Sequence, residues 1–260
     1  MELKHILLGV GFALIWASAF PSAKMAIQFC PPFLFLFLRF SSAGLFSILL
    51  GTYLGQSLKF DRKSLLWITT FGLIQNGLYL GLIFLALTKI DANVSVIIAS
   101  ILPLSVAFFS WVFFKAKISF LGLFGLVVGL AGVLLIMLQR VEKEIELLGI
   151  TLCLLGLLAT TFSTLIITKI KINKNNILIV VGLQMLAGSL FLLPLSYFFE
   201  IWSVSFNVTF LFTFIYIAAF PGIIGPVIWF YLQKEIGAVK YSSFHLSLIH
   251  ISEPTRPVMI

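Results

Sequence analysis

The chain has 260 residues, of which 61% are hydrophobic and only 10% are charged, and its mean hydropathy is +1.16. Soluble domains carry roughly a quarter charged residues, so this composition excludes a soluble globular fold. The net charge of +8 is high, but the basic residues stand singly or in short groups between apolar runs. That placement is typical of membrane topology signals, and we expect no nucleic-acid partner.

Apolar runs of about 20 residues, the length that crosses about 30 Å of hydrocarbon as a helix, follow one another along the chain. Because lipid offers the backbone no hydrogen-bonding partners, helices are the economical spanning form. We therefore predict an all-α integral membrane fold without a separate soluble domain, its partner being the lipid bilayer. Eight complete spans are predicted: Ile6 to Ile27, Pro32 to Leu54, Leu65 to Leu87, Ala92 to Phe114, Ile118 to Leu138, Leu147 to Ile170, Ile177 to Phe199 and Val208 to Leu232.

The basic residues of alternate linkers differ in number, and cytoplasmic linkers are the ones enriched in Lys and Arg. One set contains Lys4, Lys59, Arg62, Lys63, Lys115, Lys117, Lys169, Lys171, Lys174, Lys234 and Lys240. The other set contains Lys24, Lys89, Arg140 and Lys143. We predict a multi-pass protein of the cell membrane with a cytoplasmic amino terminus.

A weak internal repeat relates the two halves of the chain. Leu7-Leu8-Gly9 opens the first span as Leu147-Leu148-Gly149 opens the sixth, and Lys89 to Ala92 resembles Glu235 to Ala238, so the offset drifts from 140 to 146 residues. A unit of five spans is odd, so its second copy enters the membrane in the opposite sense, as in many secondary transporters. We predict a ten-helix fold of two inverted five-helix repeats, residues 1–138 and 139–245, of which this chain contains eight full helices and the start of a ninth.

The carboxyl end departs from this pattern. Residues 246–256 read LSLIHISEPTR, which resembles the translation of a transposon-based sequencing adapter. We therefore expect the native sequence to stop near His245 and residues 246–260 to be foreign, and we leave that tail out of the fold prediction.

The opening of the chain resembles EamA-type members of the drug/metabolite transporter superfamily. The stretch ALIWASAFPSAKMA from Ala13 to Ala26, the pair Pro31-Pro32 and the pair Arg39-Phe40 match the pattern there. Further matches are Tyr79 with Phe84-Leu85-Ala86-Leu87, Ala99-Ser100-Ile101-Leu102-Pro103, and Gly129-Leu130-Ala131-Gly132-Val133. The resemblance implies ten helices, inverted repeats, cytoplasmic termini and the export or exchange of small metabolites such as amino acids.

One departure from that family pattern follows the fourth span. Such proteins often have a Gly-Glu-Arg-Leu-Ser-like string there, whereas this chain has Lys115-Ala116-Lys117-Ile118-Ser119. Ala116 occupies the position of the Glu, so whatever that Glu does is lost in this half.

Arg39 is the one cation deep in an apolar run, and an intramembrane charge is costly unless it faces protein or water. It could bind an anion or act as a gating charge. The alternative, which the sequence favours, is a structural Arg that bonds backbone carbonyls or snorkels toward an interface.

Polar and aromatic residues at mid-depth are the candidates for a substrate cavity, which needs apolar walls and a few hydrogen-bonding groups. Beside Arg39 these candidates are Trp16, Gln75, Asn76, Tyr79, Ser100, Thr160, Thr161, Ser163, Tyr216 and Trp229. The alternative for each is hydrogen bonding between helices.

Small and cyclic residues suggest where helices bend and touch. Four prolines within the spans are candidate kinks that free backbone carbonyls near a site: Pro21, Pro103, Pro221 and Pro226. A plain structural bend is equally compatible with each of them. Glycines spaced three and four apart in the fifth span, from Gly122 to Gly132, suit close helix contact within or between subunits, so a homodimer is one expectation.

No Asp or Glu lies in the middle of any predicted span, although a buried carboxylate is the usual proton relay of coupled transporters. Either the absent helices supply one, or transport is uncoupled exchange or facilitated diffusion. Cys30 and Cys153 stand alone, so we expect no metal site or cofactor, and enzyme signatures are absent. Our leading hypothesis is a secondary transporter, with export expected, of small organic metabolites by alternating access; the alternative is a non-transporting membrane sensor or assembly partner on the same scaffold.

Overall fold

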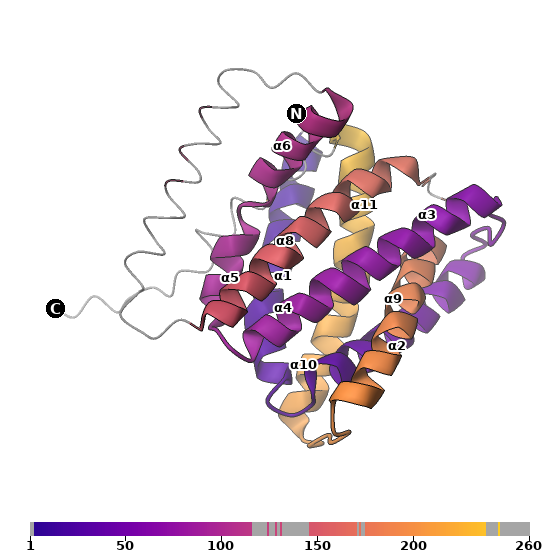
Figure 1. Cartoon of the computed structure of the whole chain (residues 1–260). Helices are drawn as coiled ribbons and strands as arrows, with labels where there is room; N and C mark the ends of the chain where they lie inside the picture. Colours follow the sequence, from indigo (N-terminus) through magenta and orange to yellow (C-terminus); the bar gives the residue numbers. More distant parts are fainter. Residues whose placement is uncertain are drawn as a thin grey trace.

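A computed structural model describes residues 3–115, 146–170, 172 and 175–237, together with the single positions 124, 128, 131 and 244. Every element within this part of the chain is helical (Figure 1). The elements of the first half are α1 (Leu3–Ala26), α2 (Pro32–Tyr53), α3 (Arg62–Gly72), the π-helical η1 (Leu73–Tyr79), α4 (Leu80–Leu87), α5 (Ala92–Ala99) and α6 (Leu102–Phe114). Those of the second half are α8 (Leu147–Ile166), the 3₁₀ turn η2 (Ile167–Lys169), α9 (Ile177–Phe199), α10 (Val208–Ile217), the π-helical η3 (Ala218–Ile224) and α11 (Gly225–Ile236).

These elements form seven helical stretches that are long and apolar enough to cross a membrane. They coincide with seven of the eight predicted spans, which confirms the all-α membrane fold. Three stretches are composite: α3, η1 and α4 make one, α5 and α6 another, and α10, η3 and α11 the last. Apart from the single positions 124, 128, 131 and 244, the predicted fifth span with its glycine face, the start of the ninth span and the tail 246–260 lie outside the described residues.

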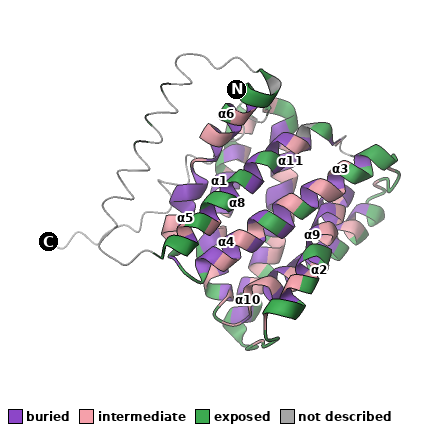
Figure 2. Ribbon diagram, viewed as in Figure 1, coloured by how far each residue is buried: buried purple, intermediate pink, exposed green. Residues whose placement is uncertain are grey.

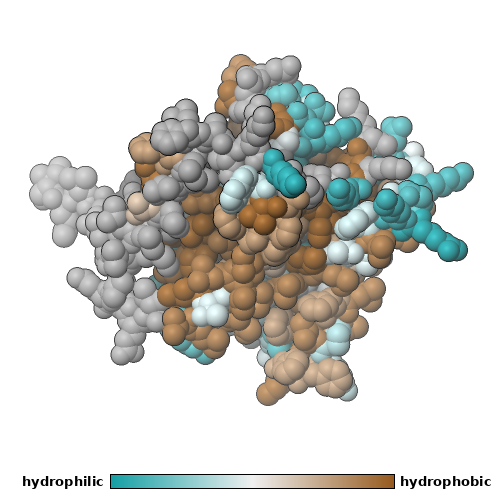
Figure 3. Space-filling view, turned by 45° about the horizontal axis from the view of Figure 1, so that its top comes forward, coloured by the Kyte–Doolittle hydropathy of each residue, from teal (hydrophilic) through white to brown (hydrophobic). Residues whose placement is uncertain are grey.

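The outer surface of the bundle is apolar. Large hydrophobic side chains such as Leu49, Phe198 and Phe212 are 66%, 75% and 71% exposed, and Figure 2 shows exposed residues on the outer faces of the helices with buried residues turned inward. Figure 3 shows a broad hydrophobic surface with hydrophilic residues gathered toward one end. Exposed apolar area of this extent is unfavourable in water but is the surface that a bilayer solvates.

Helices from the two halves interleave, so α2 lies beside α9 (Figure 1). Glycines permit this contact: a Cβ added at Gly44 would lie 3.1 Å from the Gly182 carbonyl oxygen, and one added at Gly51 would lie 2.8 Å from Ile179. Because the earlier residue of α2 meets the later residue of α9, the two helices are antiparallel. Backbone contact between small residues is the usual way in which membrane helices associate closely.

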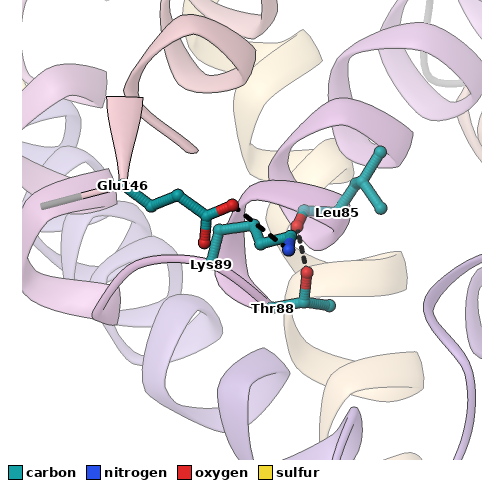
Figure 4. A network of polar contacts seen from close by, with 4 residues as sticks. All are labelled: Leu85, Thr88, Lys89 and Glu146. Atoms are coloured by element: carbon teal, nitrogen blue, oxygen red, sulfur yellow. Dashed lines mark hydrogen bonds and ion pairs between the residues drawn. The ribbon is translucent and has the colours of Figure 1, made fainter. Parts of the chain in front are cut away.

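Polar contacts fix the helix ends. At one end of the bundle the Glu200 carboxylate accepts hydrogen bonds from the Phe33 and Leu34 amides, at 2.7 and 2.8 Å, so it caps the positive amino terminus of α2. At the same end an ion pair of 3.2 Å joins Lys89, after α4, to Glu146, before α8 (Figure 4). This pair is partly exposed, so it contributes little to stability.

Candidate functional site

A cavity at the centre of the bundle is bounded by helices from both halves of the chain. Its open volume is about 40 Å³, which is room for about three water molecules. The walls are mainly apolar and aromatic with a few polar groups, as in small-molecule sites generally. The lining residues are Trp16, Ala19, Phe20, Ala23, Arg39, Phe40, Phe71, Gln75, Asn76, Tyr79, Leu80, Ile83, Phe84, Gln184, Met185, Ile217, Pro221, Pro226 and Trp229.

The two π-helical segments both contribute to this wall. η1 supplies Gln75, Asn76 and Tyr79, and η3 supplies Pro221. A π turn contains an extra residue relative to an α turn, and such turns are frequent at functional sites because they re-aim side chains. In η3 the proline removes a backbone donor, which gives a local reason for the irregular turn.

Gln75 is held by the neighbouring helix α8. Its side-chain oxygen accepts a hydrogen bond of 3.1 Å from the Thr160 hydroxyl and a second one from the Ser163 hydroxyl. Its amide nitrogen is buried and has no partner among the described residues. Thr160 and Ser163 therefore lie behind the cavity wall, where they fix the orientation of a residue that does line it.

Asn76 contacts α9 instead. Its amide nitrogen donates a hydrogen bond of 3.0 Å to the Gln184 backbone carbonyl and another to the Gln184 side-chain oxygen. The backbones approach closely here because Gly72 and Gly188 lack side chains, so that a Cβ at Gly188 would lie 3.1 Å from the Gly72 carbonyl oxygen. This contact joins the third and seventh spans at the depth of the cavity.

Arg39 extends from α2 into the same cavity and is only 4% exposed. Its guanidinium lies 4.8 Å from the centre of the Phe40 ring, and its Nε has no hydrogen-bond partner among the described residues. The only ion pair within the described part of the chain is the one between Lys89 and Glu146. Within the described part of the chain, the Nε thus donates to no backbone carbonyl, which is one of the two structural roles that the sequence favoured, the other being snorkelling toward an interface.

Aromatic rings form the rest of the wall. Trp16 and Trp229 meet edge to face at 6.0 Å between ring centres, and Phe71 lies 5.6 Å from Trp229. Such packing presents flat, amphipathic surfaces toward the cavity.

The remaining predicted site residues are not part of the cavity wall. The Ser100 and Thr161 hydroxyls bond carbonyls within their own spans, at 2.6 and 2.7 Å, and Tyr216 bonds the Ser18 hydroxyl at 2.5 Å. Pro21 is exposed on α1, and Pro103 begins α6 after the break between α5 and α6. Pro226, by contrast, lines the cavity at the start of α11.

Sequence reasoning missed Gln184 and Met185. A repeat offset of 145 residues, within the range read from the sequence, pairs Gln184 with Arg39 and Met185 with Phe40. The same offset maps η1, residues 73–79, onto η3, residues 218–224. Applying that offset to Arg39 would have found Gln184.

The model of the EamA-like transporter family matches residues 3–138. The chain is 28% identical over 246 residues to an "uncharacterized transporter in trpA 3'region" of Buchnera aphidicola subsp. Schlechtendalia chinensis, covering 92% of this chain and 79% of that protein. It is 24% identical over 232 residues to the "uncharacterized transporter YvbV" of Bacillus subtilis, covering 89% and 75% respectively. It is also 24% identical over 253 residues to "Protein PagO" of Salmonella typhimurium, covering 95% and 81%. Because the family model matches more than half of its length, this chain belongs to the EamA-like transporter family.

Proposed function

We propose that this membrane transporter moves small organic metabolites, such as amino acids or related compounds, by alternating access around the central cavity. The observation that supports this most directly is the pair of π-helical segments, η1 and η3. They occupy positions 145 residues apart in the third and eighth spans, and both line the cavity. Equivalent irregular helices on either side of a midplane site are the arrangement on which inverted-repeat transporters rely.

The antiparallel packing of α2 on α9 supports the inverted repeat, residues 1–138 and 139–245. The second and seventh spans cross the bundle in opposite senses, as copies of a five-span unit would. Small residues bring the two backbones close at their contact, where the Gly44 position lies against the Gly182 carbonyl, and we propose that one repeat rocks against the other about this contact. Motion about this contact would expose the cavity to each side of the membrane in turn.

We propose export as the physiological direction and an amino terminus in the cytoplasm. At one end of the described helices lie Lys4, Lys59, Arg62, Lys63, Lys115, Lys169 and Lys234, whereas Lys24 and Lys89 lie at the other. Cytoplasmic linkers carry such an excess of Lys and Arg.

Cysteine labelling tests this orientation. Ser57→Cys, between α2 and α3, should resist a membrane-impermeant maleimide in intact cells, and Ser203→Cys, between α9 and α10, should react. The opposite labelling pattern would reverse the orientation.

Reconstitution tests transport directly. Full-length protein in liposomes loaded with unlabelled metabolites should accelerate entry of the same labelled compounds by counterflow. We propose uncoupled exchange, because the acidic residues of the described spans, Asp61, Asp91, Glu146, Glu200 and Glu235, all lie at helix ends or in linkers. Strong dependence on a pH gradient would contradict uncoupled exchange, and absence of counterflow across a broad metabolite panel would favour a non-transporting sensor.

A further inference from the structure

The cavity contains one formal charge. Arg39 is the one charged side chain among the described lining residues, and no carboxylate lies in that wall. Burying an unpaired charge away from water is unfavourable by several kcal/mol. Only a close counter-ion with additional hydrogen bonds offsets that desolvation energy. Among the described residues, the guanidinium therefore has no counter-ion.

The side-chain amide of Gln75 is a second hydrogen-bond donor in this wall that lacks an acceptor among the described residues. Its buried nitrogen has no partner in that part of the chain, whereas Thr160 and Ser163 both donate to the oxygen of the same amide. The neighbouring Asn76 amide nitrogen is already used by Gln184. The Arg39 Nε and the Gln75 Nε2 of this wall are both donors, and they suit a ligand group that only accepts.

We propose that the transported compound carries a single negative charge on a carboxylate, which is bound by the Arg39 guanidinium and the Gln75 amide while the rest of the molecule lies against Trp16 and Trp229. This inference rests on the proposed transport function and names its substrate class. The guanidinium matches a carboxylate by two parallel hydrogen bonds. One cation balances one negative charge, whereas a phosphate monoester, at about −1.5 to −2 near pH 7, would leave charge uncompensated.

Matched ligands test the charge requirement. Full-length protein in detergent is titrated with carboxylates of three to six carbons, with the amide of each acid, and with sodium chloride and sodium phosphate. Tryptophan fluorescence and the thermal midpoint report binding, since two tryptophans form the wall. We expect carboxylates to bind about tenfold or more tightly than their amides, the size of a lost charge-assisted hydrogen bond. Equal binding of acids and amides, or equal protection by chloride or phosphate, would overturn the proposal.

Variants assign the effect to the two donors. Arg39→Gln should abolish the preference for acids, and Arg62→Gln, at the exposed start of α3, should leave it unchanged. Gln75→Glu keeps the side-chain shape and places a counter-ion within the protein, so it should also abolish the preference, even where Arg39→Gln fails to fold. Persistence of the preference in Gln75→Glu would count against the proposal.

Counterflow separates this inference from the proposed function. If the wild-type protein exchanges carboxylates and Arg39→Gln abolishes that exchange, both the transport function and the carboxylate site are supported. If neutral or cationic compounds exchange equally well with and without Arg39, transport stands and the carboxylate site is wrong. If no compound exchanges, the proposed function itself fails.

Discussion

The Thr160 hydroxyl of α8 donates a hydrogen bond of 3.1 Å to the side-chain oxygen of Gln75 in the neighbouring η1. A residue outside the cavity wall thus holds the side-chain oxygen of a residue that lines the cavity. We expect Thr160→Val, which preserves shape but removes the donor, to weaken substrate binding about fivefold, the value of one neutral hydrogen bond.

Thr161 is the matched control for this substitution. It is also buried, but its hydroxyl bonds the Leu157 carbonyl one turn earlier in the same helix. Thr161→Val should change the half-saturating concentration in counterflow by less than a factor of two. Equal effects of the two substitutions would show that Thr160 does not position Gln75.

The close approach of the third and seventh spans predicts a stability effect. A Cβ at Gly72 would meet the Gln184 backbone, which cannot move aside as a flexible side chain could. Gly72→Ala should therefore lower the free energy of unfolding in detergent by about 1–3 kcal/mol. Gly11→Ala, where an added Cβ meets nothing within 4 Å, should be neutral or stabilising because alanine is the better helix former; a loss at Gly11 as large as that at Gly72 would contradict a steric cause.

Glu200 links the end of α9 to the start of α2. Glu200→Ala removes two hydrogen bonds to backbone amides and the compensation of the helix dipole, so it should cost about 1–2 kcal/mol of stability. Glu146→Ala breaks only the partly exposed pair with Lys89 and should cost less than about 1 kcal/mol. Chemical denaturation of both variants in one detergent checks this order, and a reversed order would refute the capping role.

Cys30 lies in the linker between α1 and α2 and is 2% exposed. Burial, and next the negative charge of Glu200, raises the pKa of this thiol from 9.0 to about 12. Only the thiolate reacts, and with that pKa roughly one thiol in 10,000 is ionised at pH 8. Folded protein should therefore resist iodoacetamide at neutral pH and react after unfolding in SDS; rapid labelling of Cys30 in folded protein would contradict this environment.

The same thiol predicts a pH dependence of stability. The pKa of Cys30 is higher in the folded state than in the unfolded state. The contribution of the neutral thiol to the free energy of unfolding is therefore fully present below pH 9 and is lost as the pH rises toward 12. The thermal midpoint of the wild-type protein should fall more steeply over that range than the midpoint of Cys30→Ala. Parallel curves for the two proteins would show that the thiol does not ionise with unfolding.

Span positions followed from the sequence because hydrocarbon thickness fixes the length of an apolar run, as α2 and α9 illustrate. Arg39, Gln75, Asn76 and Trp229 could be selected because polar and large aromatic groups at mid-depth require protein partners. The orientation of each hydroxyl was not predictable. Thr160 and Thr161 are adjacent and chemically identical, and only the tertiary contact with η1 distinguishes them.

The π-helical segments could not be predicted from the sequence either, since η1 contacts α8 and α9 and no local residue pattern marks it. Pro221 indicated an irregularity in η3, yet Pro21 is accommodated inside a continuous α1. A proline removes one donor wherever it stands, and packing decides whether the helix bends around it.

Among the described spans, those that contain η1 and η3 are also the two longest, at 26 and 29 residues, against 20 to 24 for the others. A bilayer of ordinary thickness needs about 20 residues, so these two spans are long enough to cross it with a tilt. Their inclination varies with hydrophobic mismatch, and both form walls of the cavity. We therefore expect the inclination of both walls to depend on the acyl-chain length of the surrounding lipid, and the exchange rate to pass through an optimum as that chain is lengthened.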